Sequence, residues 1–413
     1  MGLQRFGYLR WCVGALLIVL LAGGCGDSED GNERARERVG EVLDRRAVAV
    51  RNNDLHGYLA VVDPGSGQQR DHQREVFQNL RRLPLAHWSY HVTDLELRED
   101  GLAYTQVRLR YQLRGFDPEP VTATEELVFT HRDGDWYLVT ERPGSPRQLW
   151  EQGRMSVHQG SHGLVLSADD GDAANVVTAR MLRRVGAAAD VAVPVVAERW
   201  PRGWARSVVV EVPGTLYGVG QRLGTSAESY EGIAALTLGK GKGKGGRPAD
   251  RIVVNPEAYG ELSDTGQQVV MTHETTHVAT RKHTSDATPM WLSEGLGDWF
   301  GYLGSGRSPR TAAPKLTSAV RDGRVPERLP SDRQFAYDAG AETLGMAYEG
   351  SWLACRMIAE EWGEERLMEF YRKVGGKSDD QRAAVEAALG DVLGLDRAEF
   401  TARWRDYLRS ELG

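Results

Sequence analysis

The chain has 413 residues, of which 41% are hydrophobic and 26% are charged, and both values are ordinary for a globular protein. A chain of this length can bury a sizeable core and is long enough for two or more domains. Its 51 basic and 58 acidic residues give a formal charge of −7. This mild acidity argues against a nucleic-acid-binding protein, which normally has a basic face. We therefore expect no nucleic-acid partner.

A leader is predicted over residues 1–24, where Arg5 and Arg10 are followed by an apolar run too short to span a bilayer comfortably. The leader ends in Leu-Ala-Gly-Gly, followed by Cys25. This ending resembles a bacterial lipoprotein signal, in which the cysteine is lipidated and becomes the new N-terminus. The resemblance implies a membrane anchor on Cys25 at the extracytoplasmic face, whereas plain secretion with a chance cysteine is the alternative. The segment 25–40 is strongly polar and is expected to form a flexible tether.

Helices and then strands are predicted after this segment. An apolar stripe over 41–62 predicts a helix that ends at Pro64-Gly65-Ser66-Gly67, and a second helix is predicted over 74–83. Strand patterns follow at 90–97, 104–113, 123–130 and 136–140. The last two strands are joined by Arg132-Asp133-Gly134-Asp135, a glycine-containing hairpin loop.

This succession of helices and a curled antiparallel sheet that ends in Gly-Asp-Trp-Tyr resembles the nuclear transport factor 2-like cone fold. The resemblance implies a cone-shaped α+β domain over 41–143. Folds of this kind often enclose a small ligand. This sequence has no group of polar residues that identifies such a ligand. We therefore favour a role for this domain as a spacer or docking module.

A linker is predicted over 143–153, and a second domain over 150–413. Its strands are expected at 163–167, 207–213, 233–238 and 252–255, with a helix over 173–200. The Gly/Lys repeat at 239–246 is expected to be a mobile hairpin tip, and the chain after residue 263 is expected to be almost wholly helical. The predicted fold class is therefore α+β, with a small mixed sheet before a mostly helical C-terminal half.

The sequence His273-Glu274-Thr275-Thr276-His277 is the main chemical signal. It falls on a helix whose start is marked by Asp264 and, three residues on, Gln267. Residues four apart share one face of a helix, so the two imidazoles project together and can bind Zn²⁺. Glu274 is offset toward the position of a bound water. The alternative is a helix with two surface histidines and an unrelated acid.

An open zinc site needs a third protein ligand. Glu294 lies 17 residues after His277 on a helix that Pro289 can start, and Asp298 is four residues further on the same face. We expect Glu294 to reach the metal and Asp298 to accept a hydrogen bond from a ligand imidazole. His283 is nearer a predicted turn and is not expected to bind metal.

These residues resemble the gluzincin metallopeptidases, and most of all the small bacterial peptidase-MA-like domains, over about 150–413. The resemblance implies a zincin-like fold, with His273, His277 and Glu294 as zinc ligands. It also implies Glu274 as the general base and Asp298 as the acid that supports a ligand histidine.

The same family uses a downstream Tyr or His to stabilise the oxyanion. Tyr348 is our candidate and Tyr337 is the alternative, although Tyr348 could also be a core aromatic stacked one turn from Trp352. The Gly-x-Met-x-Asn exopeptidase signature is absent from the sequence, which leaves endopeptidase action more open.

The implied function is a membrane-anchored, extracytoplasmic zinc peptidase that acts on peptides or proteins. A zinc-activated water would attack the peptide bond, with Glu274 as the base that takes the water proton. The strand at 252–255, if it forms a sheet edge, could pair with an extended substrate. The alternative is a non-catalytic lipoprotein that uses the same fold for envelope binding or scaffolding.

Overall fold

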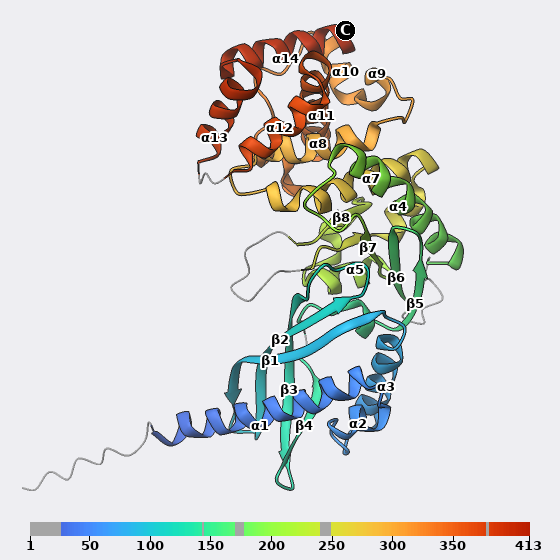
Figure 1. Cartoon of the computed structure of the whole chain (residues 1–413), viewed down its shortest axis with the longest axis vertical. Coiled ribbons are helices and arrows are strands. Elements are labelled where there is room, and N and C mark those ends of the chain that lie inside the picture. Colours follow the sequence, from blue (N-terminus) through green and yellow to red (C-terminus); the bar gives the residue numbers. More distant parts are fainter. Residues whose placement is uncertain (1–25, 143, 170–176, 240–248, 377–379) are drawn as a thin grey trace, which may run out of the picture.

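The computed structural model describes residues 26–142, 144–169, 177–239, 249–376 and 380–413. Over these residues the chain is an α+β protein with two small sheets and a helical C-terminal half, as predicted. Figure 1 shows these three parts in a row, with the N-terminal sheet at one end and the C-terminal helices at the other. The predictions for the leader, for Cys25 and for nearly all of the Gly/Lys repeat concern residues outside these ranges.

The N-terminal part contains three helices and one antiparallel sheet. The helices are α1 (Gly26–Arg51), α2 (Leu55–Ala60) and α3 (Gly67–Leu80). The strands β1 (Leu85–Leu97), β2 (Leu102–Leu113), β3 (Val121–Arg132) and β4 (Asp135–Glu141) lie side by side in sequence order. α1 crosses this sheet (Figure 1), and the apolar side chains of helix and sheet form one core.

The start of α1 differs from the prediction. Residues 25–40 were expected to be a flexible tether, but the chain is helical from Gly26. Ala35 and Val39 are buried in the core that α1 shares with the sheet. Within 26–40 only these two apolar residues, four positions apart, belong to this core. The other residues are mostly charged or polar, so the sequence shows no clear helical pattern there. The helix predicted over 41–62 is also split, because Asp54 caps the separate helix α2 by accepting from the Gly57 N–H.

The predicted hairpin between the last two strands of this sheet is present. Arg132 pairs with Asp135, which leaves a loop of two residues, Asp133 and Gly134. Their φ angles are 52° and 87°, so both residues adopt the left-handed conformation that a tight hairpin turn requires.

The second sheet has five strands. In spatial order they are β5 (Arg154–Gln159), β6 (Gly163–Asp169), β7 (Val208–Val212), β9 (Ile252–Val254) and β8 (Ala235–Thr237). β6, β7 and β9 are parallel, and the antiparallel strands β5 and β8 form the edges. β5 was not predicted. The proposed role of 252–255 as an edge strand is wrong, because β9 lies between β7 and β8.

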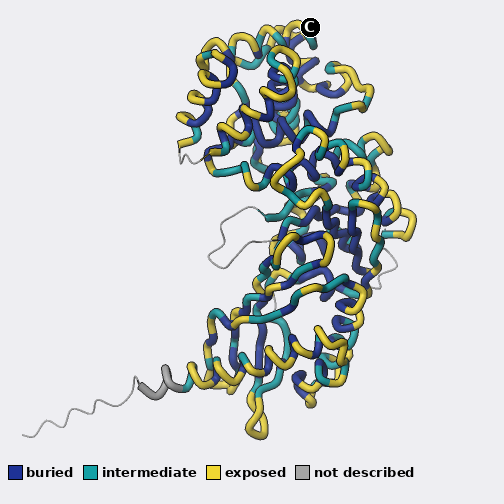
Figure 2. The backbone as a smooth tube through the Cα atoms, in the orientation of Figure 1, coloured by how far each residue is buried: buried dark blue, intermediate teal, exposed yellow. Residues whose placement is uncertain are grey.

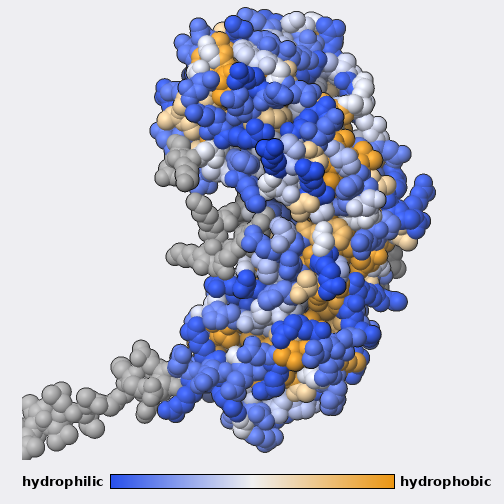
Figure 3. All heavy atoms as spheres, viewed as in Figure 1, coloured by the Kyte–Doolittle hydropathy of each residue, from blue (hydrophilic) through white to orange (hydrophobic). Residues whose placement is uncertain are grey.

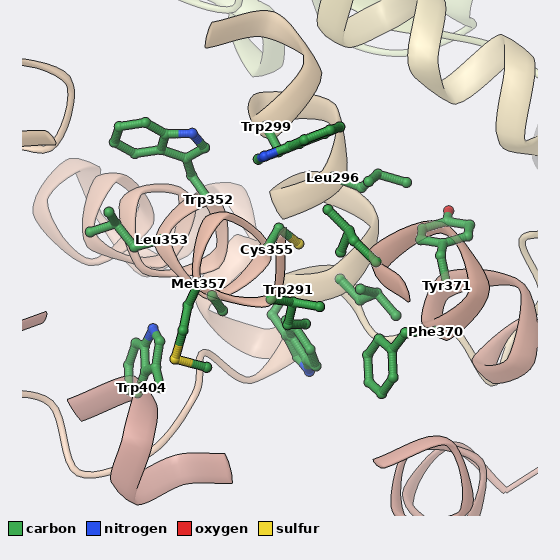
Figure 4. Packing of buried hydrophobic residues seen from close by; sticks show 14 of the residues in the cluster. Trp291, Leu296, Trp299, Trp352, Leu353, Cys355, Met357, Phe370, Tyr371 and Trp404 are labelled. Carbon is green, nitrogen blue, oxygen red and sulfur yellow. The ribbon is translucent and has the colours of Figure 1, made fainter. Parts of the chain in front are cut away.

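The remaining chain is mostly helical, as predicted. The helix α4 (Ala179–Arg199) packs on β6 and on α7. The other helices are α5 (Leu216–Leu223), α6 (Pro256–Glu261), α7 (Asp264–Thr280), α8 (Met290–Tyr302), α9 (Pro309–Ala312), α10 (Pro314–Arg321), α11 (Ala341–Trp362), α12 (Glu364–Val374), α13 (Gln381–Ala388) and α14 (Arg397–Leu412). Figure 4 shows the large apolar side chains around Cys355 on α11, among them Trp291 and Phe370. This core fixes α8 against α11.

The two sheets are joined through a shared core. Residues 143–153 were predicted to be a linker, but Leu149 and Trp150 are buried. The ring centroid of Trp150 lies 5.6 Å from that of Trp88 and 5.3 Å from that of Tyr111 in the N-terminal sheet. Residues 148–152 are therefore part of the protein interior, and Figure 2 shows buried backbone continuing from one sheet to the next.

An ion pair also crosses this seam. The guanidinium of Arg251, next to β9, donates from Nη1 and Nη2 to the two carboxylate oxygens of Asp117 at 2.8 and 2.9 Å. The exposed fractions of the two side chains are only 2% and 5%. The N-terminal part and the second sheet are thus held together by both apolar and charged contacts.

The outer surface is mainly hydrophilic. In Figure 3 apolar residues are most numerous over the middle third of the molecule, where the second sheet lies. Within the described ranges, no helix combines the length and the apolar character needed to cross a membrane.

Candidate metal centre

Helix α7 places the two histidines of the motif side by side. The helix begins at Asp264, as predicted, and its capping side chain is that of Ser263, which accepts from the Gly266 N–H. His273 and His277 are one turn apart, and their Nε2 atoms are separated by 3.0 Å. His273 is buried and His277 is half-buried. The i, i+4 spacing therefore turns both rings toward one point, as expected.

Helix α8 brings Glu294 to the same point. Its Oε2 atom lies 3.2 Å from His273 Nε2 and 3.5 Å from His277 Nε2. Two ligands of a tetrahedral zinc ion, each at about 2.0–2.2 Å from the metal, are about 3.3–3.6 Å apart. The three separations between these nitrogen and oxygen atoms are close to that range, so the set fits a metal ion of this size. Among the described residues it is the one group of three His, Cys, Asp or Glu side chains close enough to share a metal ion.

Asp298 forms a hydrogen bond with the first histidine. Its Oδ1 atom lies 2.8 Å from Nδ1 of His273. A proton on Nδ1 leaves the lone pair of Nε2 free to face the ligand cluster. This hydrogen bond therefore fixes both the tautomer and the orientation of the ring.

Two glycines let α8 come close enough. A Cβ atom on Gly297 would lie 2.8–3.0 Å from the ring of His273, and one on Gly295 would lie 2.4 Å from the Ser351 carbonyl oxygen on α11. Both distances are below normal contact distances, so the helices would have to separate. The sequence Glu-Gly-Leu-Gly-Asp at 294–298 thus supplies the two acids and the room that their helix needs.

The charges around the cluster favour a cation. Burial disfavours the charged form of His273, but the carboxylates of Asp298 and Glu294 outweigh burial and raise the pKa of this imidazole well above its ordinary value. Burial also opposes ionisation of Glu294, yet the adjacent imidazoles of His277 and His273 hold the pKa of this carboxyl well below its ordinary value. A divalent cation would replace the protons that these groups attract.

Glu274 lines a small cavity beside the cluster. The cavity has a volume of about 180 Å³ and is lined by Ala234, Ala235, Val269, Val270, His273, Glu274, Asp298 and Tyr348. Glu274 accepts a hydrogen bond at Oε2 from the hydroxyl of Thr237 on the edge strand β8, at 2.6 Å. Thr237 was missed in the sequence, where a threonine in a predicted strand gives no sign of this contact.

Tyr348 lies at the same cavity. Its ring centroid is 6.4 Å from that of His273 and 5.3 Å from that of Phe335. The alternative interpretation, a core aromatic, also has support, because Tyr348 packs against the hydrophobic core that includes Phe335 and Trp352. The Trp352 indole itself stacks on Tyr302, with centroids 4.7 Å apart. The side chain of Tyr337 is outside the described part of the structure.

Two further reactive side chains do not belong to the cluster. The ring of His283 packs against Trp200, with centroids 5.5 Å apart, and His283 is not among the clustered ligands. Cys355 is fully buried, and burial raises the pKa of its thiol well above the ordinary value. A buried, protonated thiol is a poor nucleophile.

A larger cavity of about 610 Å³ lies at the seam between the N-terminal sheet and α5, and His72 and Arg147 are among its lining residues. Size alone does not identify a reactive site, and the metal-ligand geometry is found at the smaller cavity. Comparisons with protein-family models, curated proteins and solved structures found no match to this chain.

Proposed function

We propose that this protein is a zinc-dependent peptidase of the gluzincin type. The observation that carries the proposal is the convergence of His273 Nε2, His277 Nε2 and Glu294 Oε2, at 3.0–3.5 Å from one another, beside a cavity lined by Glu274. Three atoms that can each offer a lone pair to one point are arranged as the ligands of a metal ion are. Two imidazoles and one carboxylate are a known ligand set of catalytic zinc, which keeps a fourth position open.

When bound in such a site, zinc would polarise the carbonyl group of the substrate and lower the pKa of its bound water toward neutral pH. Glu274 would take the water proton and pass it to the leaving amine. Asp298 would hold His273 in its ligand tautomer. The hydroxyl of Tyr348 would donate to the oxyanion that forms on the substrate.

The edge strand β8, which pairs with β9 alone among the described strands, offers a place for the substrate. Ala234 and Ala235, at the start of β8, line the cavity that contains Glu274. β8 pairs on one side with β9, and its other side is an edge of the sheet. An extended peptide could add to this edge, with main-chain hydrogen bonds that do not depend on its sequence. β8 therefore takes the role that the sequence assigned to 252–255.

The direct test compares the wild-type chain with the Glu274→Gln variant. Gln has the same shape but cannot take a proton, so the variant should bind one zinc ion per chain and lose hydrolysis of unfolded casein. Zinc content is measured by atomic absorption, and cleavage is measured with and without a chelator. Full activity in the variant removes the general-base assignment. Zinc binding without any hydrolysis by the wild type favours the non-catalytic alternative.

We also propose that the protein is a lipoprotein on the extracytoplasmic face of the cell membrane. The support is the apolar leader that ends directly before Cys25. Fractionation of cells that express the wild type or Cys25→Ser should move the protein from the membrane pellet to the soluble fraction. An unchanged distribution would contradict lipidation at Cys25.

A further inference from the structure

The hydroxyl of Thr237 makes the closest described contact to the carboxylate of Glu274. Thr237 is the last residue of β8, and its Oγ1 atom lies 2.6 Å from Glu274 Oε2. The same Oγ1 atom is 3.1 Å from the Glu274 carbonyl oxygen. The two acceptors share one hydroxyl proton, and the contact to the carboxylate is the shorter of the two. The shorter contact is also to a charged acceptor when the carboxyl is ionised, and such hydrogen bonds are the stronger ones.

The strand that bears Thr237 is fixed to the helix that bears Glu274. At the end of α7, Arg281 donates from Nη2 to the carbonyl oxygen of Leu238 at 2.8 Å, and from Nε to Oδ1 of Asp250 at 2.8 Å. Leu238 directly follows β8, and Asp250 lies just before β9. One arginine therefore ties the ends of both strands to α7, so Thr237 is held at a constant position relative to Glu274.

We propose that Thr237 is a positioning residue for Glu274. The inference rests on the proposed peptidase function, in which Glu274 is the general base. A glutamate side chain has three rotatable bonds, and proton transfer needs its carboxylate at hydrogen-bond distance from the water. The Thr237 hydroxyl occupies Oε2 and limits the rotation of the carboxylate, which leaves Oε1 to accept the proton. The edge strand would then serve the reaction twice, by pairing with the substrate and by orienting the base.

The test uses two substitutions that separate the hydroxyl from the rest of the side chain. Thr237→Val keeps the shape and removes the hydroxyl, whereas Thr237→Ser keeps the hydroxyl. Thr317→Val is a matched control, because it removes a buried hydroxyl on α10 that donates to the carbonyl oxygen of Ala313, just before the helix, and does not line this cavity. For each variant we would measure kcat, KM, zinc content and the thermal unfolding midpoint.

We expect Thr237→Val to lower kcat by roughly 10- to 100-fold, the range that a small misplacement of a catalytic group can cost, with KM and zinc content unchanged. Thr237→Ser and Thr317→Val should keep a kcat within about threefold of the wild type. A wild-type kcat in Thr237→Val overturns the proposal. An equal loss in Thr237→Ser overturns it too, because the hydroxyl would then not be the group that matters.

A second measurement separates this proposal from the proposed function. Crystal structures of the zinc-loaded wild type and Thr237→Val would show the Glu274 carboxylate directly. We expect it within hydrogen-bond distance of Oγ1 in the wild type, and displaced or disordered in the variant. If the wild type hydrolyses nothing, the peptidase proposal fails, and this structural comparison still decides the positioning claim. The same carboxylate position in both structures overturns it.

Discussion

The N-terminal part and the metal centre both bury charged side chains, but they compensate the charge differently. In the N-terminal part, Arg46 donates to Gln73 Oε1 at 2.6 Å and to the hydroxyl of Tyr58. Its charge also faces Glu125. Positive and negative groups are thus present together, as they are again in the Arg251–Asp117 pair at the seam.

At the metal centre the carboxylates are paired, among the described residues, with imidazoles and not with arginine. Three acceptor atoms, two from imidazoles and one from Glu294, face one another at 3.0–3.5 Å. Within the described ranges, no lysine or arginine forms an ion pair with Glu294 or Asp298. Protons on the imidazoles compensate these carboxylates, as the raised pKa of His273 and the lowered pKa of Glu294 indicate. The N-terminal part therefore compensates its buried charge with arginine, whereas the metal centre does so with imidazoles, whose protons a divalent cation could replace.

The largest expected effect on stability comes from removing one partner of the buried ion pair between Arg251 and Asp117 at the seam. Asp117→Ala leaves the buried guanidinium of Arg251 without its carboxylate, so we expect a loss of about 3–5 kcal/mol in the free energy of unfolding. Urea unfolding followed by tryptophan fluorescence measures it. The double variant Asp117→Leu with Arg251→Met is the control, because replacing both charges by apolar groups should recover most of the loss. A change below about 1 kcal/mol in Asp117→Ala would contradict the importance of this pair.

A smaller effect is expected from the hydrogen bond that supports the ligand histidine. Asp298→Asn can still accept a hydrogen bond from Nδ1 of His273, but without the negative charge, so zinc affinity should fall about 10- to 100-fold. Competition with a chromophoric zinc chelator measures the affinity. Asp391→Asn, on an exposed pair with Lys373, is the control for loss of one acidic charge. Unchanged affinity in Asp298→Asn would mean that the acid does not assist the metal centre.

The smallest effect concerns a buried carboxyl in the N-terminal part. Burial raises the pKa of Glu125 to about 7 against an ordinary value of 4.5, although Arg46 opposes this shift. The folded state therefore holds this proton more tightly than the unfolded state does. The stability that the proton confers is fully present below pH 4.5 and is lost as the pH rises through about 7.

Glu125→Gln imitates the protonated carboxyl at every pH. The wild type should therefore lose more stability than this variant between about pH 5 and pH 8, by on the order of 1 kcal/mol. Urea midpoints at the two pH values give the difference. Parallel changes in both proteins would show that Glu125 does not titrate in this interval.

Much of the fold and of the metal cluster could be predicted from the sequence. The spacing of His273 and His277 determines their common face on any helix, and Glu294 and Asp298 repeat the same spacing on the next helix. The β3–β4 hairpin was found because Asp133 and Gly134 are the residue types that its turn requires. In each case a local rule of backbone geometry was sufficient.

The missed features depend on contacts between distant parts of the chain. Neither the interior position of β9 nor the edge position of β8 follows from strand patterns, because strand order is set by packing. The helical start of α1 depends on Ala35 and Val39 meeting the sheet, and the contact of Thr237 with Glu274 joins residues 37 positions apart. The local pattern of a single sequence does not indicate such long-range contacts.

The central claim is that His273, His277 and Glu294 hold one divalent cation. Anomalous diffraction at the zinc edge, from crystals grown with equimolar zinc, tests it most directly. We predict one anomalous peak per chain, at about 2.0–2.2 Å from Nε2 of both histidines and from a carboxylate oxygen of Glu294. No peak at this position, or a peak bound by other side chains while these three remain in contact with one another, would contradict the account.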